Sequence, residues 1–206
     1  MDYPFPFERV SKNGSFMHGM VNRSIEHFLR ATYGDAIWHE IAQAGGIDAA
    51  GFNGMRQYPD DITQAMLQAA SATLGKTACD ILEDTGAWLV QIEAMRRLLR
   101  FSGGKFSEFV LALEELPARA RLVLPDLEIP PLMVAQIEPD VYRIYGEGWG
   151  GLLWIVSGAL RGMADDYGVL ALIEAGGAGV EMRVLMQEYT QGRPFAFAPA
   201  TISGQG

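Results

Sequence analysis

Histidine side chains are the first candidates for chemistry in this sequence, because an imidazole can bind a metal or move a proton near neutral pH. All three histidines, His18, His27 and His39, lie within the first 39 residues. His18 stands where a helix is expected to begin, a common place for a polar structural residue. His27 and His39 lie beside apolar residues of amphipathic segments, which favours surface positions.

Sulfur ligands are few and scattered. Cys79 follows Thr77 at a predicted helix start, where the helix dipole can lower the pKa of a thiol, although Lys76 is its one basic neighbour. A single cysteine forms no internal disulfide, which fits a reducing compartment, and no Cys or His cluster has zinc-ligand spacing. Three methionines offer thioether sulfurs but have the spacing of core residues: Met17, Met20 and Met66.

Motifs of the common enzyme classes are missing. The chain has no G-x-S-x-G and no P-loop. The glycine-rich stretch 146–151 lacks the Lys-Ser/Thr pair that phosphate binding requires. The sequence therefore predicts a domain that is not an enzyme.

Composition narrows the class of protein further. The 206 residues carry a net charge of -9, which disfavours nucleic-acid binding, and the length suits one globular domain. The longest apolar run, Leu152 to Val156, is far shorter than the roughly 20 residues of a membrane-spanning helix. The first residues do not resemble a signal peptide, so we expect a cytoplasmic protein without a membrane span.

Apolar spacing predicts an α+β fold, with helices in the first half and antiparallel strands in the second. Residues 1–16 are expected to form an extension, 17–190 the domain and 191–206 a flexible tail. Helices are predicted from about 21 to 33, 35 to 44, 62 to 74, 77 to 86, 87 to 99, 105 to 116 and 151 to 166. Two hairpins are predicted, one pairing 133–137 with 141–145 and the other pairing 169–174 with 180–188.

Three motifs together resemble the heme nitric oxide/oxygen-binding (H-NOX) family. They are MHGMVN at 17–22, YPDDIT at 58–63 and YGEGWGGL at 145–152, and the likeness extends over about residues 17 to 190. The resemblance implies a four-stranded antiparallel sheet with an inserted helix, and a heme between the N-terminal helices and the sheet. It also implies a nitric oxide sensor that signals to a partner such as a histidine kinase or a cyclic-dinucleotide enzyme.

The residue that matches the family's axial histidine is a proline. The family pattern L-D-x-L-H-A-R corresponds to Leu113 to Arg119, and Pro117 occupies the histidine position. Proline has no side-chain donor for iron and no backbone N–H. It also disfavours the α conformation in the preceding residue, so we expect the helix to end or kink at Leu116.

The family's Tyr-x-Ser-x-Arg motif, which binds the heme propionates, is also altered. Its positions fall on Tyr145, Glu147 and Trp149. A carboxylate repels propionates and an indole gives them no bidentate cation, so the usual heme mode is expected to be lost. Trp149 and Trp154 would fill space that a porphyrin occupies.

Several interpretations stay open at this point. The pocket is collapsed, or holds another apolar ligand, or still binds heme through an unusual ligand such as His18, which the resemblance places on the distal side. A ligand-free interaction module is a further alternative. Tyr145 is expected to pack in its strand, and Glu147 to face water in a loop.

Overall fold

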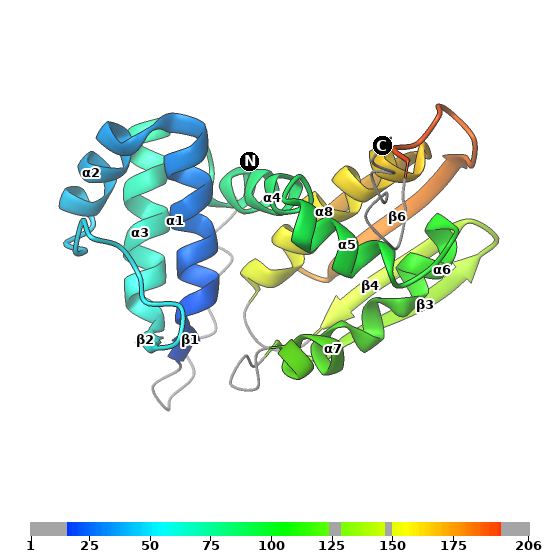
Figure 1. Cartoon of the computed structure of the whole chain (residues 1–206), viewed down its shortest axis with the longest axis horizontal. Coiled ribbons are helices and arrows are strands. Elements are labelled where there is room, and N and C mark those ends of the chain that lie inside the picture. Colours follow the sequence, from blue (N-terminus) through cyan, green and yellow to red (C-terminus); the bar gives the residue numbers. More distant parts are fainter. Residues whose placement is uncertain (1–15, 124–128, 147–149, 195–206) are drawn as a thin grey trace, which may run out of the picture.

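The computed structural model describes residues 16–123, 129–146 and 150–194 (Figure 1). The first elements form a helical half that includes two very short strands. In chain order they are β1 (Phe16–His18), α1 (Gly19–Tyr33), α2 (Asp35–Ala44), β2 (Gln57–Pro59) and α3 (Asp60–Leu74). The antiparallel pairing of β1 with β2 was not predicted, because three-residue strands have too few positions to show an alternating pattern.

Five short helical elements follow and lead to the sheet. They are α4 (Ala78–Leu89), α5 (Glu93–Arg100), α6 (Phe106–Leu111), the 3₁₀ helix η1 (Ala112–Glu115) and α7 (Leu116–Val123). Thr77 caps α4 as predicted, in a capping box with Asp80. The predicted end of this helix at Gly86 is wrong, because α4 continues to Leu89.

The second half is a four-stranded antiparallel sheet with one inserted helix. Its elements are β3 (Leu132–Glu138), β4 (Val141–Gly146), α8 (Gly151–Tyr167), β5 (Leu170–Gly176) and β6 (Gly179–Met186). The strand order is β3-β4-β6-β5, and Figure 1 shows α8 running along the sheet. The predicted α+β class, both hairpins and the helix between them are confirmed.

Helices α4 and α8 join the two halves through a close contact made by glycines. A Cβ on Gly158 of α8 would lie 1.8 Å from the carbonyl oxygen of Glu83, and one on Gly86 of α4 would lie 2.0 Å from the carbonyl oxygen of Ile155. The two backbones therefore touch where these glycines meet. This contact explains why Gly86 stands inside a helix, where glycine is otherwise unfavourable.

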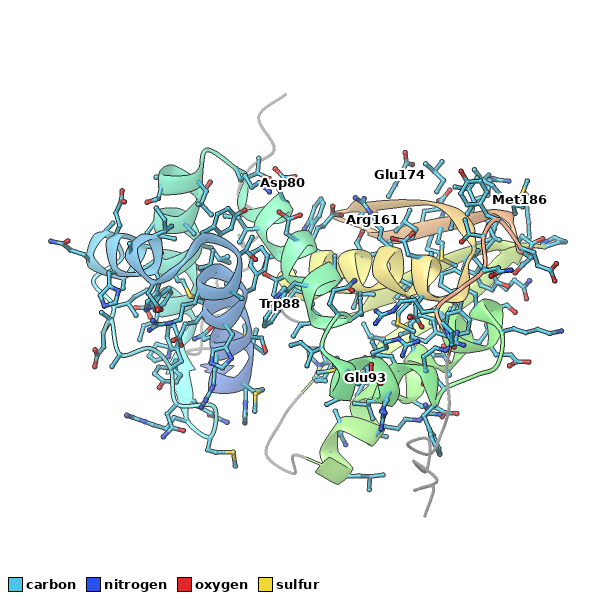
Figure 2. The ribbon with its side chains drawn as sticks, turned by 45° about the horizontal axis from the view of Figure 1, so that its top comes forward. Asp80, Trp88, Glu93, Arg161, Glu174 and Met186 are labelled. Carbon is cyan, nitrogen blue, oxygen red and sulfur yellow. The ribbon has the colours of Figure 1, made fainter. Side chains whose placement is uncertain are left out.

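Polar side chains reinforce the same crossing. The carboxylate of Glu83 accepts a hydrogen bond from the Ser157 hydroxyl at 2.8 Å and pairs with Arg161 at 3.1 Å. Arg161 also donates to the carbonyl oxygen of Ile173 in β5 at 3.0 Å (Figure 2). One arginine thus links α4, α8 and the edge of the sheet.

The buried apolar residues form two clusters. One lies among α1 to α4 and includes Trp38, and the other lies between the sheet and the helices that cover it. Helix α8 contributes to both, because Leu153 and Val156 belong to the sheet cluster while Trp154 and Ile155 pack against the first. None of the helices in the described ranges is long and apolar enough to cross a membrane.

The ends of the chain are only partly described. Residues 1–15 and 195–206 lie outside the described residues, so the extension and the flexible tail stay predictions. Residues 191–194 are described, and the N–H of Arg193 donates to the carbonyl oxygen of Asp166 at 2.8 Å. The first part of the predicted tail therefore lies against α8.

Candidate functional site

Pro117, which matches the family's axial position, lies in the first turn of α7. The expectation that Leu116 leaves the α conformation is wrong, because Leu116 has φ -55° and ψ -44°. The expected end or kink of the helix does fall here, since η1 ends at Glu115 and α7 begins at Leu116. A helix does change at this point, since the predicted helix 105–116 consists of α6 and η1. Proline is well suited to a first helical turn, where its missing N–H needs no partner. The ring of Pro117 is buried.

Side-chain contacts hold this segment against the sheet. Leu113 belongs to the sheet cluster and Leu116 packs against it. The carboxylate of Glu114 accepts the N–H of Val134 in β3 at 2.8 Å. Arg119 bonds both Glu115 and Ser102. The polar groups around Pro117 are therefore engaged in holding η1 and α7 in place.

His18 ends β1 and caps α1. Its Nδ1 accepts the N–H of Met20 at 3.2 Å, and 7% of its surface is exposed. This bond assigns the proton of the neutral ring to Nε2. His18 therefore has the expected position at a helix start, with its Nδ1 lone pair in use.

Tyr145 is half-buried near the end of β4, where it pairs with Met133 of β3. Residues 147–149 lie outside the described residues, so the predicted effects of Glu147 and Trp149 stay predictions. The three candidate residues lie on elements with different neighbours. His18 is in β1, which pairs with β2, Pro117 is in α7, which follows η1, and Tyr145 is in β4, which lies between β3 and β6.

The other candidate ligands are in ordinary structural surroundings. Met66 is fully buried in the N-terminal cluster, and Met17 is buried as well. His27 is exposed and accepts a hydrogen bond from Arg23, and His39 is also exposed, as predicted. Within the described ranges, no three His, Cys, Asp or Glu side chains lie close enough to hold a metal ion.

Cys79 does not have the lowered pKa that its position at a helix start suggested. Burial raises the pKa of its thiol, and the neighbouring carboxylates of Asp80 and Glu83 raise it further. Burial and these carboxylates thus act against the lowering that a helix start can cause. A reactive thiolate is therefore disfavoured at neutral pH.

Two of the pockets lined by described residues are open to solvent, and Pro117 lines neither of them. One, of about 380 Å³, lies between the segment after α2 and the start of α3, beside Phe52 and Tyr58. The other, of about 450 Å³, lies between the start of α6 and the end of β6, beside Phe106 and Tyr167. Neither is lined by His18, Pro117 or Tyr145.

A buried charge cluster was missed at the sequence level. The guanidinium of Arg96 is 2.6 Å from the carboxylate of Asp166, and the two residues are 4% and 3% exposed. Arg96 also donates to the carbonyl oxygen of Pro194 at 2.9 Å, while Arg100 lies 3.8 Å from the centre of the Tyr167 ring. The local sequence MRRLLR resembles a solvated basic patch, because Asp166, the acidic partner of Arg96, lies 70 residues further along the chain.

Comparison with known proteins identifies the family. The model of the family described as Haem-NO-binding matches residues 18–174. Soluble guanylate cyclase 89Db of Drosophila melanogaster is 21% identical over 155 residues, which is 73% of this chain and 23% of the relative. The chain thus spans about a quarter of the length of such curated relatives.

Solved structures agree with the match in fold. The Fe(II) unliganded H-NOX protein from K. algicida superposes with a TM-score of 0.71 at 15% identity, covering 85% of this chain and all of that one. The I5F mutant of T. tengcongensis H-NOX gives 0.67 at 15% identity, covering 83% and 99%. At this identity the likeness concerns the fold alone. Together with the family match, it follows that the chain belongs to the Haem-NO-binding, or H-NOX, family.

Proposed function

We propose that this chain is a non-enzymatic H-NOX sensory domain that has lost the family's usual heme ligation and signals by contacting a protein partner. The observation that carries the proposal is Pro117. At the position of the axial ligand, the chain presents a buried ring that has no lone pair to give to iron.

The neighbours of Pro117 do not supply a replacement. Its buried companions on η1 and α7 are Leu113 and Ala120, which offer only carbon. The nearest carboxylates are engaged, Glu114 with the backbone of β3 and Glu115 with Arg119. The donors present on this side therefore do not fit a heme iron, which supports a lost or replaced ligand.

Heme bound through His18 is the second candidate, and the cap geometry weighs against it. Because Nδ1 accepts the N–H of Met20, Nε2 carries the ring proton. Coordination through Nε2 would move that proton to Nδ1, and the cap of α1 would be lost. A typical N-cap contributes about 1 kcal/mol, so ligation by His18 would work against the fold of α1.

The partner class is proposed from the family. We propose a signalling protein, such as a histidine kinase or a cyclic-dinucleotide enzyme, in the cytoplasm, where the single Cys79 stays reduced. The curated relatives are called soluble guanylate cyclases, and the matched part is a minor share of their length. The pocket would be closed or would hold an apolar molecule other than heme.

Hemin titration of the purified protein tests the loss of heme. Free hemin has a Soret band of its own, so the signal that counts is the shifted, sharpened Soret band of heme ligated by the protein. We expect no such band in the wild type, and no change in Pro117→Ala, because neither proline nor alanine can bind iron. A Soret band in the wild type that disappears in His18→Ala would replace the proposal with the second candidate. A wild-type band that survives in His18→Ala would also refute the proposal, because another ligand would then hold the iron.

Two further measurements separate the forms of the pocket. Restoring the family residues in Pro117→His combined with Glu147→Ser and Trp149→Arg gives a Soret band if porphyrin-sized space is still open. Native mass spectrometry of the wild type detects an apolar molecule that co-purifies. A closed pocket gives neither signal and leaves a module that acts through protein contacts alone.

A further inference from the structure

The chain between α2 and β2, here called the 45–56 segment, is held to the helical half by a buried charged pair. The carboxylate of Glu26, which is 4% exposed, accepts the N–H of Phe52 at 2.8 Å and pairs with Arg30 at 2.9 Å. Arg30 and Trp38 each donate to the carbonyl oxygen of Ala49, at 2.8 and 2.9 Å. The segment therefore follows a fixed course along the helices, which Figure 1 shows between α2 and β2.

A glycine makes this attachment possible. Gly51 has a φ of +93°, and a Cβ at this position would lie 2.1 Å from the carboxylate of Glu26. A larger residue would push the 45–56 segment away from its anchor. The segment is thus fixed by side chains of α1 and α2, and a pocket beside it exists before any ligand binds, which lowers the cost of binding.

The 45–56 segment and the first half of α3 flank the pocket of about 380 Å³. This volume lies within the roughly 300 to 1,000 Å³ of small-molecule sites. Five of its side chains present mainly carbon: Ile47, Phe52, Tyr58, Ile62 and Ala65. None of the described residues that line it is basic.

Two carboxylates line the same pocket without a counter-ion. Asp48 and Asp61 are both exposed, and neither forms an ion pair with a residue in the described ranges. Asp48 uses its Oδ1 to accept the N–H of Ala50 at 2.9 Å. The first turn of α3 adds about half a positive charge, but Asp60 in that turn adds another negative one. The field at the pocket therefore favours a cation.

The aromatic ring of Tyr58 is fixed in place and already attracts a cation. It packs edge-to-face against Phe52, with the ring centres 5.1 Å apart, and its hydroxyl accepts the N–H of Asn53 at 2.9 Å. The guanidinium of Arg56, which does not line the pocket, lies 5.7 Å from the centre of the Tyr58 ring. At such distances an aromatic ring stabilises a positive charge.

We infer that this pocket binds a small organic cation whose ammonium group carries alkyl groups. The carboxylates of Asp48 and Asp61 balance its charge, Tyr58 offers an aromatic ring, and the alkyl groups pack against Ile62 and Ala65. A fully alkylated ammonium has no N–H to satisfy, which suits walls made mainly of carbon. A bare metal ion would instead need six or more oxygen ligands. Pro117 does not line this site, so the inference is independent of the loss of heme.

Choline is the probe for this site, and a neutral molecule of the same shape is the control. The neutral molecule is the alcohol in which a tert-butyl group replaces the trimethylammonium group. In titrations of the full chain followed by NMR, we expect choline to cause saturable shifts in the amide signals of the 45–56 segment and the start of α3. The neutral alcohol binds at least about tenfold more weakly, because it gains nothing from the carboxylates. Added salt weakens the binding of choline.

Substitutions that keep shape separate charge from packing. Asp48→Asn combined with Asp61→Asn lowers the affinity for choline at least about tenfold and leaves that for the neutral alcohol unchanged. Tyr58→Leu weakens the binding of choline, whereas Tyr58→Phe keeps the ring and retains it. Glu40→Gln, at an exposed position on α2 that does not line the pocket, is the matched control and binds choline like the wild type. Circular dichroism checks that each variant is folded.

Three results would overturn the inference. The first is the absence of saturable shifts with choline, and the second is equal affinity for choline and the neutral alcohol. The third is wild-type affinity in the folded variant that carries both Asp48→Asn and Asp61→Asn. Shifts that leave the 45–56 segment and α3 unaffected would place the cation elsewhere and would overturn it as well.

Discussion

Substitution of Gly158 by alanine tests the backbone contact between α4 and α8. The new methyl carbon would lie 1.8 Å from the carbonyl oxygen of Glu83, whereas real Cβ atoms come no closer than about 3.0 Å. The helices must therefore separate by at least about 1.2 Å. The hydrogen bond from Ser157 to Glu83, now 2.8 Å long, would stretch beyond its useful range.

The magnitude follows from two opposing effects. Overpacking of a well-packed contact costs about 3 kcal/mol at the upper end of the usual range. Alanine regains about 1 kcal/mol, because it is the better helix former. The net loss is about 2 kcal/mol, which lowers the melting temperature by roughly 4 to 8 °C in a chain of this size.

Calorimetry or circular dichroism measures the shift. The matched control is Gly177→Ala in the β5–β6 turn, where an added Cβ meets nothing within 4 Å, and we expect little change. A melting temperature for Gly158→Ala equal to that of Gly177→Ala would refute the close approach of the two backbones.

Three further predictions concern other parts of the chain. Asp166→Asn removes the buried carboxylate that lies 2.6 Å from Arg96, while the longer contact of Arg96 with Glu93 at 3.4 Å stays, and it lowers stability by about 3 kcal/mol; thermal unfolding shows the loss, and limited proteolysis shows faster cleavage within 189–194, which an unchanged cleavage rate would contradict. Because its pKa is raised, Cys79 in the folded protein reacts with iodoacetamide only at higher pH than in the urea-unfolded chain, and a lower midpoint in the folded protein would contradict this. Thr77→Ala removes the capping box with Asp80 and costs about 1 kcal/mol in thermal unfolding, whereas Thr77→Ser keeps most of it; equal losses would argue against the cap.

Local signals predicted much of the fold. The two hairpins could be placed because their turns carry their own chemistry: Asp140 has a positive φ of 62° in the first, and glycines make the second. The start of α4 was visible in Thr77 for the same reason. These features depend on a few neighbouring residues, so the sequence alone is enough to find them.

Features that depend on distant residues were missed or misplaced. Gly86 was taken for a helix end because the contact that requires a glycine there is made with α8, which lies far away in the sequence. Arg96 looked like a surface residue because Asp166 lies 70 residues away. Pro117 was expected to end or kink a helix at Leu116, and η1 does end there, but the same proline also lies in the first turn of α7. A proline gives the same local signal in both cases, and the packing of η1 against β3 decides between them.

The candidate site was predictable only through the family's motifs. They located Pro117, Tyr145 and His18, but no local pattern says which of them meet in space. The cap made by His18 depends on the conformation at the β1–α1 junction, and Tyr145 depends on its pairing with Met133.

Helix α8 couples the unfolding of the helical half to the unfolding of the sheet half. Leu153 belongs to the sheet cluster, and its neighbour in the same turn, Trp154, packs, partly buried, against the cluster among α1 to α4. Unwinding that turn exposes apolar surface on both sides at once, so neither cluster can lose its packing while the other stays intact. We therefore expect helices and sheet to unfold in a single cooperative transition, with one calorimetric peak for the domain.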